Sequence, residues 1–151
     1  MDFLKHHKHF PLIVLLTASA CGDTGSNPVP SNPVPKVVVL TDRSTYVASE
    51  TLQFDAINEQ GPPIYIFYCN NRIRYVLEQK DSTGWFVREQ WATTQCDPTL
   101  QSGVLELVAG QSVRQSLLLY YRGIFRLELV YSYTRELTNS RHIYSNEFTV
   151  Q

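Results

Sequence analysis

Cysteine and histidine are the side chains best suited to nucleophilic or metal chemistry, and both are scarce in this chain. The 151 residues include three cysteines and four histidines. Three of the histidines lie within the first nine residues, so His142 is the only one in the remaining sequence. A Ser–His–Asp or Cys–His arrangement would have to use it as the base. Because His142 stands beside Arg141 at the start of the last expected strand, we interpret it as solvated rather than catalytic.

Carboxylates are the second candidate chemistry, at Glu78, Glu89, Glu106 and Glu128. Glycoside hydrolysis needs a pair of such groups, but each of these alternates with apolar neighbours on its own expected strand, as outward-facing charges of a sheet do. Two mid-chain cysteines and one distant histidine provide too few ligands for a metal. No phosphate-binding glycine loop, EF-hand or zinc-protease motif occurs. We therefore expect no catalytic residue, no metal and no cofactor.

The first twenty residues have the layout of a secretory signal peptide. Lys5 and Lys8 precede an apolar run at residues 10–16, and small residues occupy positions 17–20. The run is far shorter than the 18 or more residues expected of a membrane-spanning helix. The alternative is a buried N-terminal helix or strand.

Cys21 directly follows this segment. The string Ala18-Ser19-Ala20-Cys21 resembles the lipobox of bacterial lipoproteins, in which the cysteine thiol is diacylated and becomes the new N-terminus. The resemblance implies lipidation of Cys21 and anchoring in a membrane, since each buried methylene of an acyl chain contributes about 0.8 kcal/mol. Gly22 stands where some Gram-negative lipoproteins carry the aspartate that retains them at the inner membrane, which favours the outer membrane.

Residues 22–35 are expected to form a tether. They contain no aromatic residue and repeat Ser-Asn-Pro-Val-Pro at 26–30 and 31–35. Alternating prolines favour an extended backbone, which would span about 40 Å at roughly 3.1 Å per residue. A proline-rich ligand for a partner module is the alternative.

Cys69 and Cys96 are the two thiols that remain if Cys21 is lipidated, as the resemblance implies. In an exported protein such a pair favours a disulfide. The bond would close a mid-chain loop and stabilise the fold by roughly 3–4 kcal/mol. Two free thiols are the alternative.

From residue 36 onward the sequence consists of short β-branched and aromatic segments separated by turn residues. Alternation is clearest near the end, where Phe125, Leu127 and Leu129 share one face and Arg126 and Glu128 take the other. Seven to nine short strands in about 115 residues favour a two-sheet sandwich. The expected strands are 36–41, 51–58, 64–69, 73–79, 85–91, 104–108, 112–121, 124–133 and 142–150.

Five segments of this region form a further pattern, namely 41–50, Gly84-Trp85, 109–112, 123–127 and the ending 144–150. They resemble strand and turn segments of bacterial immunoglobulin-like domains. The resemblance covers residues 36–151 and implies an immunoglobulin-like antiparallel β-sandwich, a fold common in envelope and surface modules but not specific for an activity. The expected organisation is therefore a signal peptide at 1–20, a lipidated cysteine and tether at 21–35, and one β-sandwich domain at 36–151.

Two further groups of side chains have alternative interpretations. The first group is aromatic and could form a binding platform, but we expect core packing for most of its members. The group consists of Tyr65, Phe67, Tyr68, Trp85, Phe86 and Trp91. Three arginines near Asn70 and Asn71 could form a small basic patch, but we expect solvated charges on strand edges or faces. They are Arg72, Arg74 and Arg88.

The function class that these features favour is a non-enzymatic, lipid-anchored envelope protein whose sandwich serves as an interaction or structural module. Its expected partners are the membrane, through the anchor, and a protein or envelope polymer. A formal net charge of −1 provides no basic field for nucleic acid. The alternatives are a proteinase inhibitor that presents the loop 93–102, and a carbohydrate-binding module that uses Trp85, Trp91 or nearby tyrosines.

Overall fold

The computed structural model describes residues 34–91, 96, 99 and 101–151. The expected signal peptide, the lipidation site Cys21 and residues 21–33 of the expected tether lie outside the described residues. All regular elements of the described part are β-strands, so it contains no helix that could cross a membrane. They are β1 (Lys36–Thr41), β2 (Thr45–Tyr46), β3 (Thr51–Gln60), β4 (Ile64–Cys69), β5 (Arg72–Ile73), β6 (Tyr75–Asp81), β7 (Gly84–Trp91), β8 (Ser102–Leu107), β9 (Ser112–Leu118), β10 (Gly123–Tyr131), β11 (Arg141–Tyr144) and β12 (Phe148–Val150).

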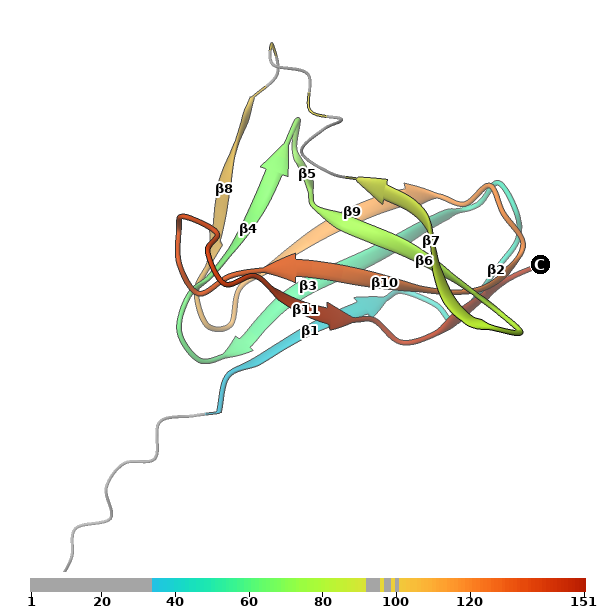
Figure 1. Ribbon diagram of the computed structural model, residues 1–151, viewed down its shortest axis with the longest axis horizontal. Helices are drawn as coiled ribbons and strands as arrows, with labels where there is room; N and C mark the ends of the chain where they lie inside the picture. Colours follow the sequence, from blue (N-terminus) through green and yellow to red (C-terminus); the bar gives the residue numbers. More distant parts are fainter. Residues whose placement is uncertain (1–33, 92–95, 97–98, 100) are drawn as a thin grey trace, which may run out of the picture. The chain divides into compact units, whose positions relative to one another are not determined.

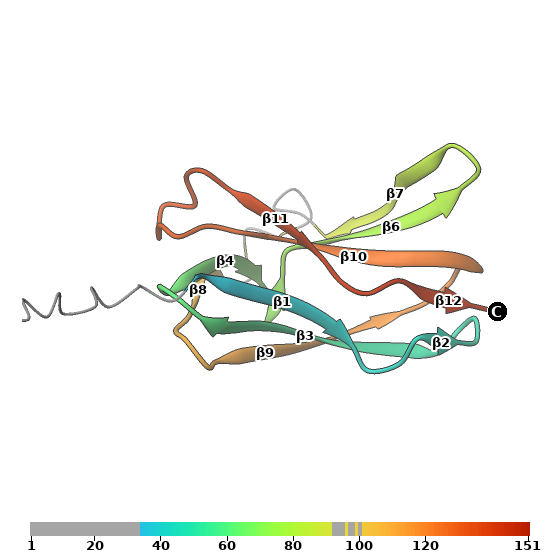
Figure 2. The ribbon, with the colours of Figure 1, turned by 90° about the horizontal axis from the view of Figure 1, so that it is seen from below.

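The strands form two facing layers. One sheet has the order β1–β3–β9, and the other has the order β2–β12–β10–β6–β7, with β11 also paired to β10. Figure 2 shows β1, β3 and β9 in one layer and β6, β7 and β10 in the other. All pairs are antiparallel except the short pair of β2 with β12. This strand order is that of an immunoglobulin-like sandwich, so the expected fold class is confirmed.

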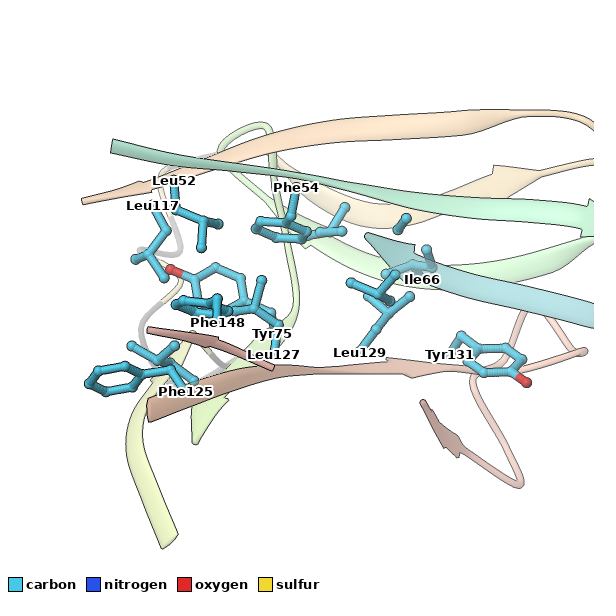
Figure 3. Packing of buried hydrophobic residues seen from close by; sticks show 14 of the residues in the cluster. Leu52, Phe54, Ile66, Tyr75, Leu117, Phe125, Leu127, Leu129, Tyr131 and Phe148 are labelled. Atoms are coloured by element: carbon cyan, nitrogen blue, oxygen red, sulfur yellow. The ribbon is translucent and has the colours of Figure 1, made fainter. Parts of the chain in front are cut away.

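The core lies between the layers and follows the period-two alternation of the strands. Leu52, Phe54 and Leu117 face it from the first sheet, while Phe125 and Leu127 face it from β10 (Figure 3). Each of these five side chains is buried. Aromatic rings meet edge-on within this core, as in the pair of Phe54 and Tyr75 at 5.6 Å between ring centroids. The core-facing side expected for Phe125, Leu127 and Leu129 is therefore confirmed.

The last expected strand, 142–150, is divided into β11 and β12. The ladder is interrupted at residues 145–147, where the Ser145 hydroxyl bonds to the main chain of β10 and Asn146 bonds to β1 in the other sheet. Ser145 Oγ accepts the Leu127 N–H at 2.9 Å, and Asn146 Oδ1 accepts the Thr41 N–H at 3.1 Å. The expected strand 73–79 is likewise divided, between β5 and β6, and β2 was not expected.

Tyr46 anchors the short strand β2 to the first sheet. Its hydroxyl donates to Asp42 Oδ1 at 2.7 Å, and the Gln53 N–H donates to the same oxygen at 2.9 Å. Burial, followed by the bond to Asp42, raises the pKa of Tyr46 to about 12. Burial alone would raise the pKa of Asp42, but the bonds from Tyr46 and Gln53 outweigh it and lower this pKa below its usual value.

Most of β4, together with β5, departs from the sheet that contains β10. Tyr65 pairs with Ser132, and Tyr75 pairs with Leu129. Between these two pairs the β10 side covers three positions, from 129 to 132, whereas the segment that runs from β4 to β6 covers ten, from 65 to 75. The surplus residues leave the sheet and pair instead with β8, in the order β5–β4–β8 (Figure 1). We call this small sheet the lobe.

Candidate functional site

Cys69 and Cys96 are joined in a disulfide, as the sequence analysis expected. Their Cα atoms are 5.7 Å apart, and Cys69 ends β4 with only 1% of its surface exposed. The bond ties the lobe to the segment that connects β7 with β8. Most of the loop expected to act in proteinase inhibition, 93–102, lies outside the described residues. The inhibitor alternative therefore remains a prediction.

A stack of aromatic and cationic side chains covers the outer face of the sheet around β10. The Arg126 guanidinium carbon lies 4.3 Å from the Trp85 ring centroid and 3.8 Å from that of Tyr144. Lys80 Nζ lies 5.2 Å from the Trp85 centroid. We call Trp85, Arg126 and Tyr144 the Arg126 stack. Because Trp85 already contacts two cations, a sugar stacking on that ring would compete with them, which does not favour the carbohydrate alternative.

Two of the predicted carboxylates lie on this face, and both have partners. Glu78 Oε2 accepts a bond from Arg126 Nε at 2.6 Å, and Glu128 Oε1 pairs with His142 Nδ1. Glu78 and Glu128 are each only 9% exposed. They face outward as expected, but they stand on β6 and β10, where side chains of neighbouring strands cover them. The expectation that His142 lies near solvent is confirmed, since its side chain is 52% exposed.

The expected core role is wrong for Trp85 and Phe86. Trp85 is half-buried in the Arg126 stack, and Phe86 is 37% exposed. They belong to β7, which is the edge strand of its sheet, so no strand lies beyond them to complete a core. The side chain of Trp91 lies outside the described structure.

A cleft opens between β9 and the lobe, and sequence analysis identified only part of it. It consists of two adjoining hollows of about 380 Å³ each, which share Asn71 and Gln115. The outer hollow is lined by Gln53, Asn70, Asn71, Arg72, Arg114, Gln115 and Ser116. The inner hollow is lined by Tyr68, Asn71, Ile73, Gln101, Val104, Leu105, Glu106, Val113 and Gln115. We call the two together the edge cleft.

Local sequence explains why the lobe forms one wall of the edge cleft. Asn70 and Asn71 connect β4 with β5 as a two-residue turn, with φ of 49° and 61°. Asparagine tolerates this left-handed region, which the tight turns of β-hairpins require. The turn is tied to the opposite wall, where Gln115 Nε2 donates to the Asn71 carbonyl at 3.1 Å.

Asn58 lies beside the turn that connects β8 with β9. Its side chain is fully buried, and Nδ2 donates to the carbonyls of Pro62 at 3.0 Å and Leu107 at 2.9 Å. Its main chain accepts from Gly110 and donates to Gln111. One residue therefore fixes where β8 and β9 separate.

The arginines expected near Asn70 and Asn71 do not gather into one patch. Arg72 lines the outer hollow, whereas Arg88 lies over the Tyr121 ring with its guanidinium carbon 3.7 Å from the centroid. Arg114 takes a place in the outer hollow that the sequence did not indicate. It forms two bonds to the Asp55 carboxylate, at 2.9 and 2.7 Å. The signal that could have located it is its pairing on β9 opposite Asp55 on β3, which only the register reveals.

Chemically, the edge cleft provides hydrogen-bond donors and apolar contact. Amide, hydroxyl and guanidinium groups line the outer hollow, and aliphatic side chains line much of the inner hollow. Among the described residues, no group of three or more His, Cys, Asp or Glu side chains is placed to hold a metal ion. The arrangement is suited to binding by hydrogen bonds and apolar burial.

Comparison with known proteins identifies no family for this chain. No family model matches the sequence, and no curated protein matches it. Similar solved structures include an alkylpurine DNA glycosylase from Pseudomonas fluorescens bound to abasic-site DNA (16% identity, 78% of this chain, 30% of that chain, TM-score 0.42). Others are the Bacillus subtilis sporulation control protein Spo0M (9%, 78%, 49%, 0.43) and PapD-like domain 7 of human CEP192 (15%, 95%, 96%, 0.34). The chain spans less than half of the first two structures, and at these TM-scores no activity or partner is carried over.

Proposed function

We propose that this chain is a lipid-anchored protein of a bacterial envelope whose immunoglobulin-like sandwich binds a protein partner at the edge cleft and catalyses no reaction. The observation that carries the proposal is the position of two adjoining hollows beside β9, a strand that pairs with β3 on one side only among the described strands. Exposed strand edges are recognised by other chains.

The walls of the edge cleft are held in place, which supports a role in binding. The disulfide, the Gln115–Asn71 bond and the buried Asn58 each tie a different part of the wall. A site whose walls are ordered before binding loses less conformational entropy when the partner arrives. An exported protein also benefits from a disulfide at such a point, because oxidising compartments preserve it.

The anchor is tested by metabolic labelling with a fatty-acid analogue. We expect the full chain to incorporate the label and to sediment with membranes, and the variant Cys21→Ser to do neither. The variant Cys69→Ser is the matched control, since it removes a cysteine outside the proposed lipidation motif and should keep the label. Equal labelling of the Cys21→Ser protein would refute the anchor.

The binding site is tested by photocrosslinking in the native envelope. A photoreactive amino acid is placed at Ser116, which lines the outer hollow, or at Val87, which is 56% exposed on β7 outside the edge cleft. We expect a discrete protein adduct from position 116 and none of the same mass from position 87. The same adducts from both positions, or none from 116, would contradict the proposed site.

A further inference from the structure

The free edge of β9 presents a regular row of main-chain groups. Leu119 N–H donates to Glu50 O, and Gln111 O accepts from Asn58 N–H, so residues at both ends of β9 bond toward β3. Because bonding alternates along an antiparallel strand, residues 111, 113, 115, 117 and 119 bond to β3, and 112, 114, 116 and 118 direct their main-chain groups away from it. No described strand pairs with that side, although the Gln115 side chain donates to the Arg114 carbonyl at 3.0 Å, a bond that an added strand would have to displace.

This edge lacks the features that commonly protect a strand from pairing. β9 contains no proline and no lysine, and its register with β3 has no irregularity over the seven residue pairs. By contrast, β7, the edge strand of the other sheet, has a register shift opposite Leu77 and Glu78. Bulges, prolines and lysines are the usual protections against added strands. The difference indicates that β9 is the edge kept open for pairing.

The two hollows lie on opposite faces of this edge. Arg114 and Ser116, whose side chains lie on the exposed face of the sheet, line the outer hollow with Gln53. Val113, which packs against the core, lines the inner hollow. A strand added beside β9 would direct successive side chains to opposite faces. One hollow would therefore receive a side chain and the other hollow its neighbour.

The lining of each hollow indicates which side chain it accepts. The outer hollow contains two arginines and no carboxylate among its lining residues, and the Arg114 side chain is 67% exposed although paired with Asp55. The inner hollow contains Ile73, Val104, Leu105 and Val113, and it also contains Glu106, whose carboxylate would repel an acidic side chain there. Opposite charge favours an acidic side chain in the first, and apolar burial favours an aliphatic one in the second.

We infer that the partner enters the edge cleft as an extended segment that pairs with the free edge of β9 and places alternating acidic and aliphatic side chains in the outer and inner hollows. The inference rests on the proposed function, because it takes the edge cleft as the binding site. It adds the mode of recognition and the chemistry of the segment recognised. Main-chain bonds supply affinity in this mode, and the hollows supply specificity.

The test selects binders to the full chain from a library of random displayed nonapeptides. We expect the selected sequences to alternate acidic and aliphatic residues. One selected peptide is then made in two N-methylated forms, with every second amide methylated in one phase or in the other. Only one edge of an added strand faces β9, so we expect methylation in one phase to lower the affinity at least about tenfold and in the other phase to leave it unchanged.

A protein variant provides an independent measurement. Ser116→Pro removes an N–H that faces the free edge, a position where an edge strand tolerates proline. We expect it to weaken peptide binding at least about tenfold, while Val87→Ala, which lies outside the edge cleft, binds normally. Equal effects of both methylation phases, selected peptides without the alternation, or no selected peptide would overturn the inference. If photocrosslinking at Ser116 still captures a partner, the proposed function survives that failure.

Discussion

Removing the bond between Cys69 and Cys96 is expected to lower stability mainly by freeing the unfolded chain. The double variant Cys69→Ala/Cys96→Ala opens a loop that spans 27 positions. The chain-entropy relation assigns about 3.5 kcal/mol at 25 °C to a loop of this length. In the folded protein Cys69 keeps its pairing with Arg72 and Ser102, so we expect the lobe to retain its strands.

Urea denaturation of the full chain measures this difference. With a slope of about 2 kcal/mol per molar, typical of a small domain, the midpoint should fall by roughly 1.5–2 M. The original chain in reducing agent should unfold near the midpoint of the double variant, because both lack the same constraint. The variant Cys21→Ser is the matched control and should unfold as the original chain does.

Two outcomes would refute this reasoning. A loss below about 1 kcal/mol would mean that the loop is restricted in the unfolded chain without the bond. Loss of the β4–β8 pairing in the folded variant, detected by hydrogen exchange, would mean that the bond holds the lobe together rather than restricting the unfolded state.

Three further predictions concern buried polar groups. Burial is the main cause that raises the pKa values of Tyr46, Tyr75 and Tyr131 to about 12, so the stability that these un-ionised phenols contribute is complete below pH 10 and lost as pH rises toward 12. Absorbance titration should show the raised pKa values and denaturation at each pH the loss of stability, and ordinary titration of all three phenols would contradict the prediction. Arg126→Met leaves the buried Glu78 carboxylate unpaired and should cost about 2–4 kcal/mol in urea denaturation, partly recovered by adding Glu78→Gln; no recovery would show that the loss comes from ring packing. Asn58→Ala removes two bonds to main-chain carbonyls and should cost about 2–3 kcal/mol, and a loss below about 0.5 kcal/mol would mean that the β8–β9 turn does not depend on it.

Much of the fold could be predicted because strands follow local patterns. The expected bounds 36–41 and 64–69 match β1 and β4. Alternating apolar residues at 125, 127, 129 and 131 required one buried face on β10, and the structure buries all four. Strand bounds were predicted less accurately where a bond to a distant residue interrupts the strand. The break between β11 and β12 depends on Thr41, more than a hundred positions away from its partner Asn146.

The candidate site was less predictable than the fold. Asn70, Asn71 and Arg72 were recognised as neighbours, but no local pattern placed Arg114 and Ser116 in the same hollow. Placing them beside the Asn70–Asn71 turn requires the register of β3 with β9 and the departure of β4 from β10. Both are pairings between segments far apart in sequence, which local patterns do not specify. The same limit applies to Glu78 and Glu128, whose burial depends on which strands flank β6 and β10.

The sequence by itself determined the all-β class, the alternating core and the pairing of Cys69 with Cys96 as the expected disulfide. The first two follow from local side-chain periodicity, and the third follows from the resemblance of residues 18–21 to a lipobox, which leaves two cysteines to pair. The tertiary structure alone decided which strand edge stays unpaired, where the two hollows lie and which charges are buried. The physical reason is that a strand's alternation specifies which face is buried but not which neighbour it pairs with. Edges and clefts therefore arise only when all the pairings are made.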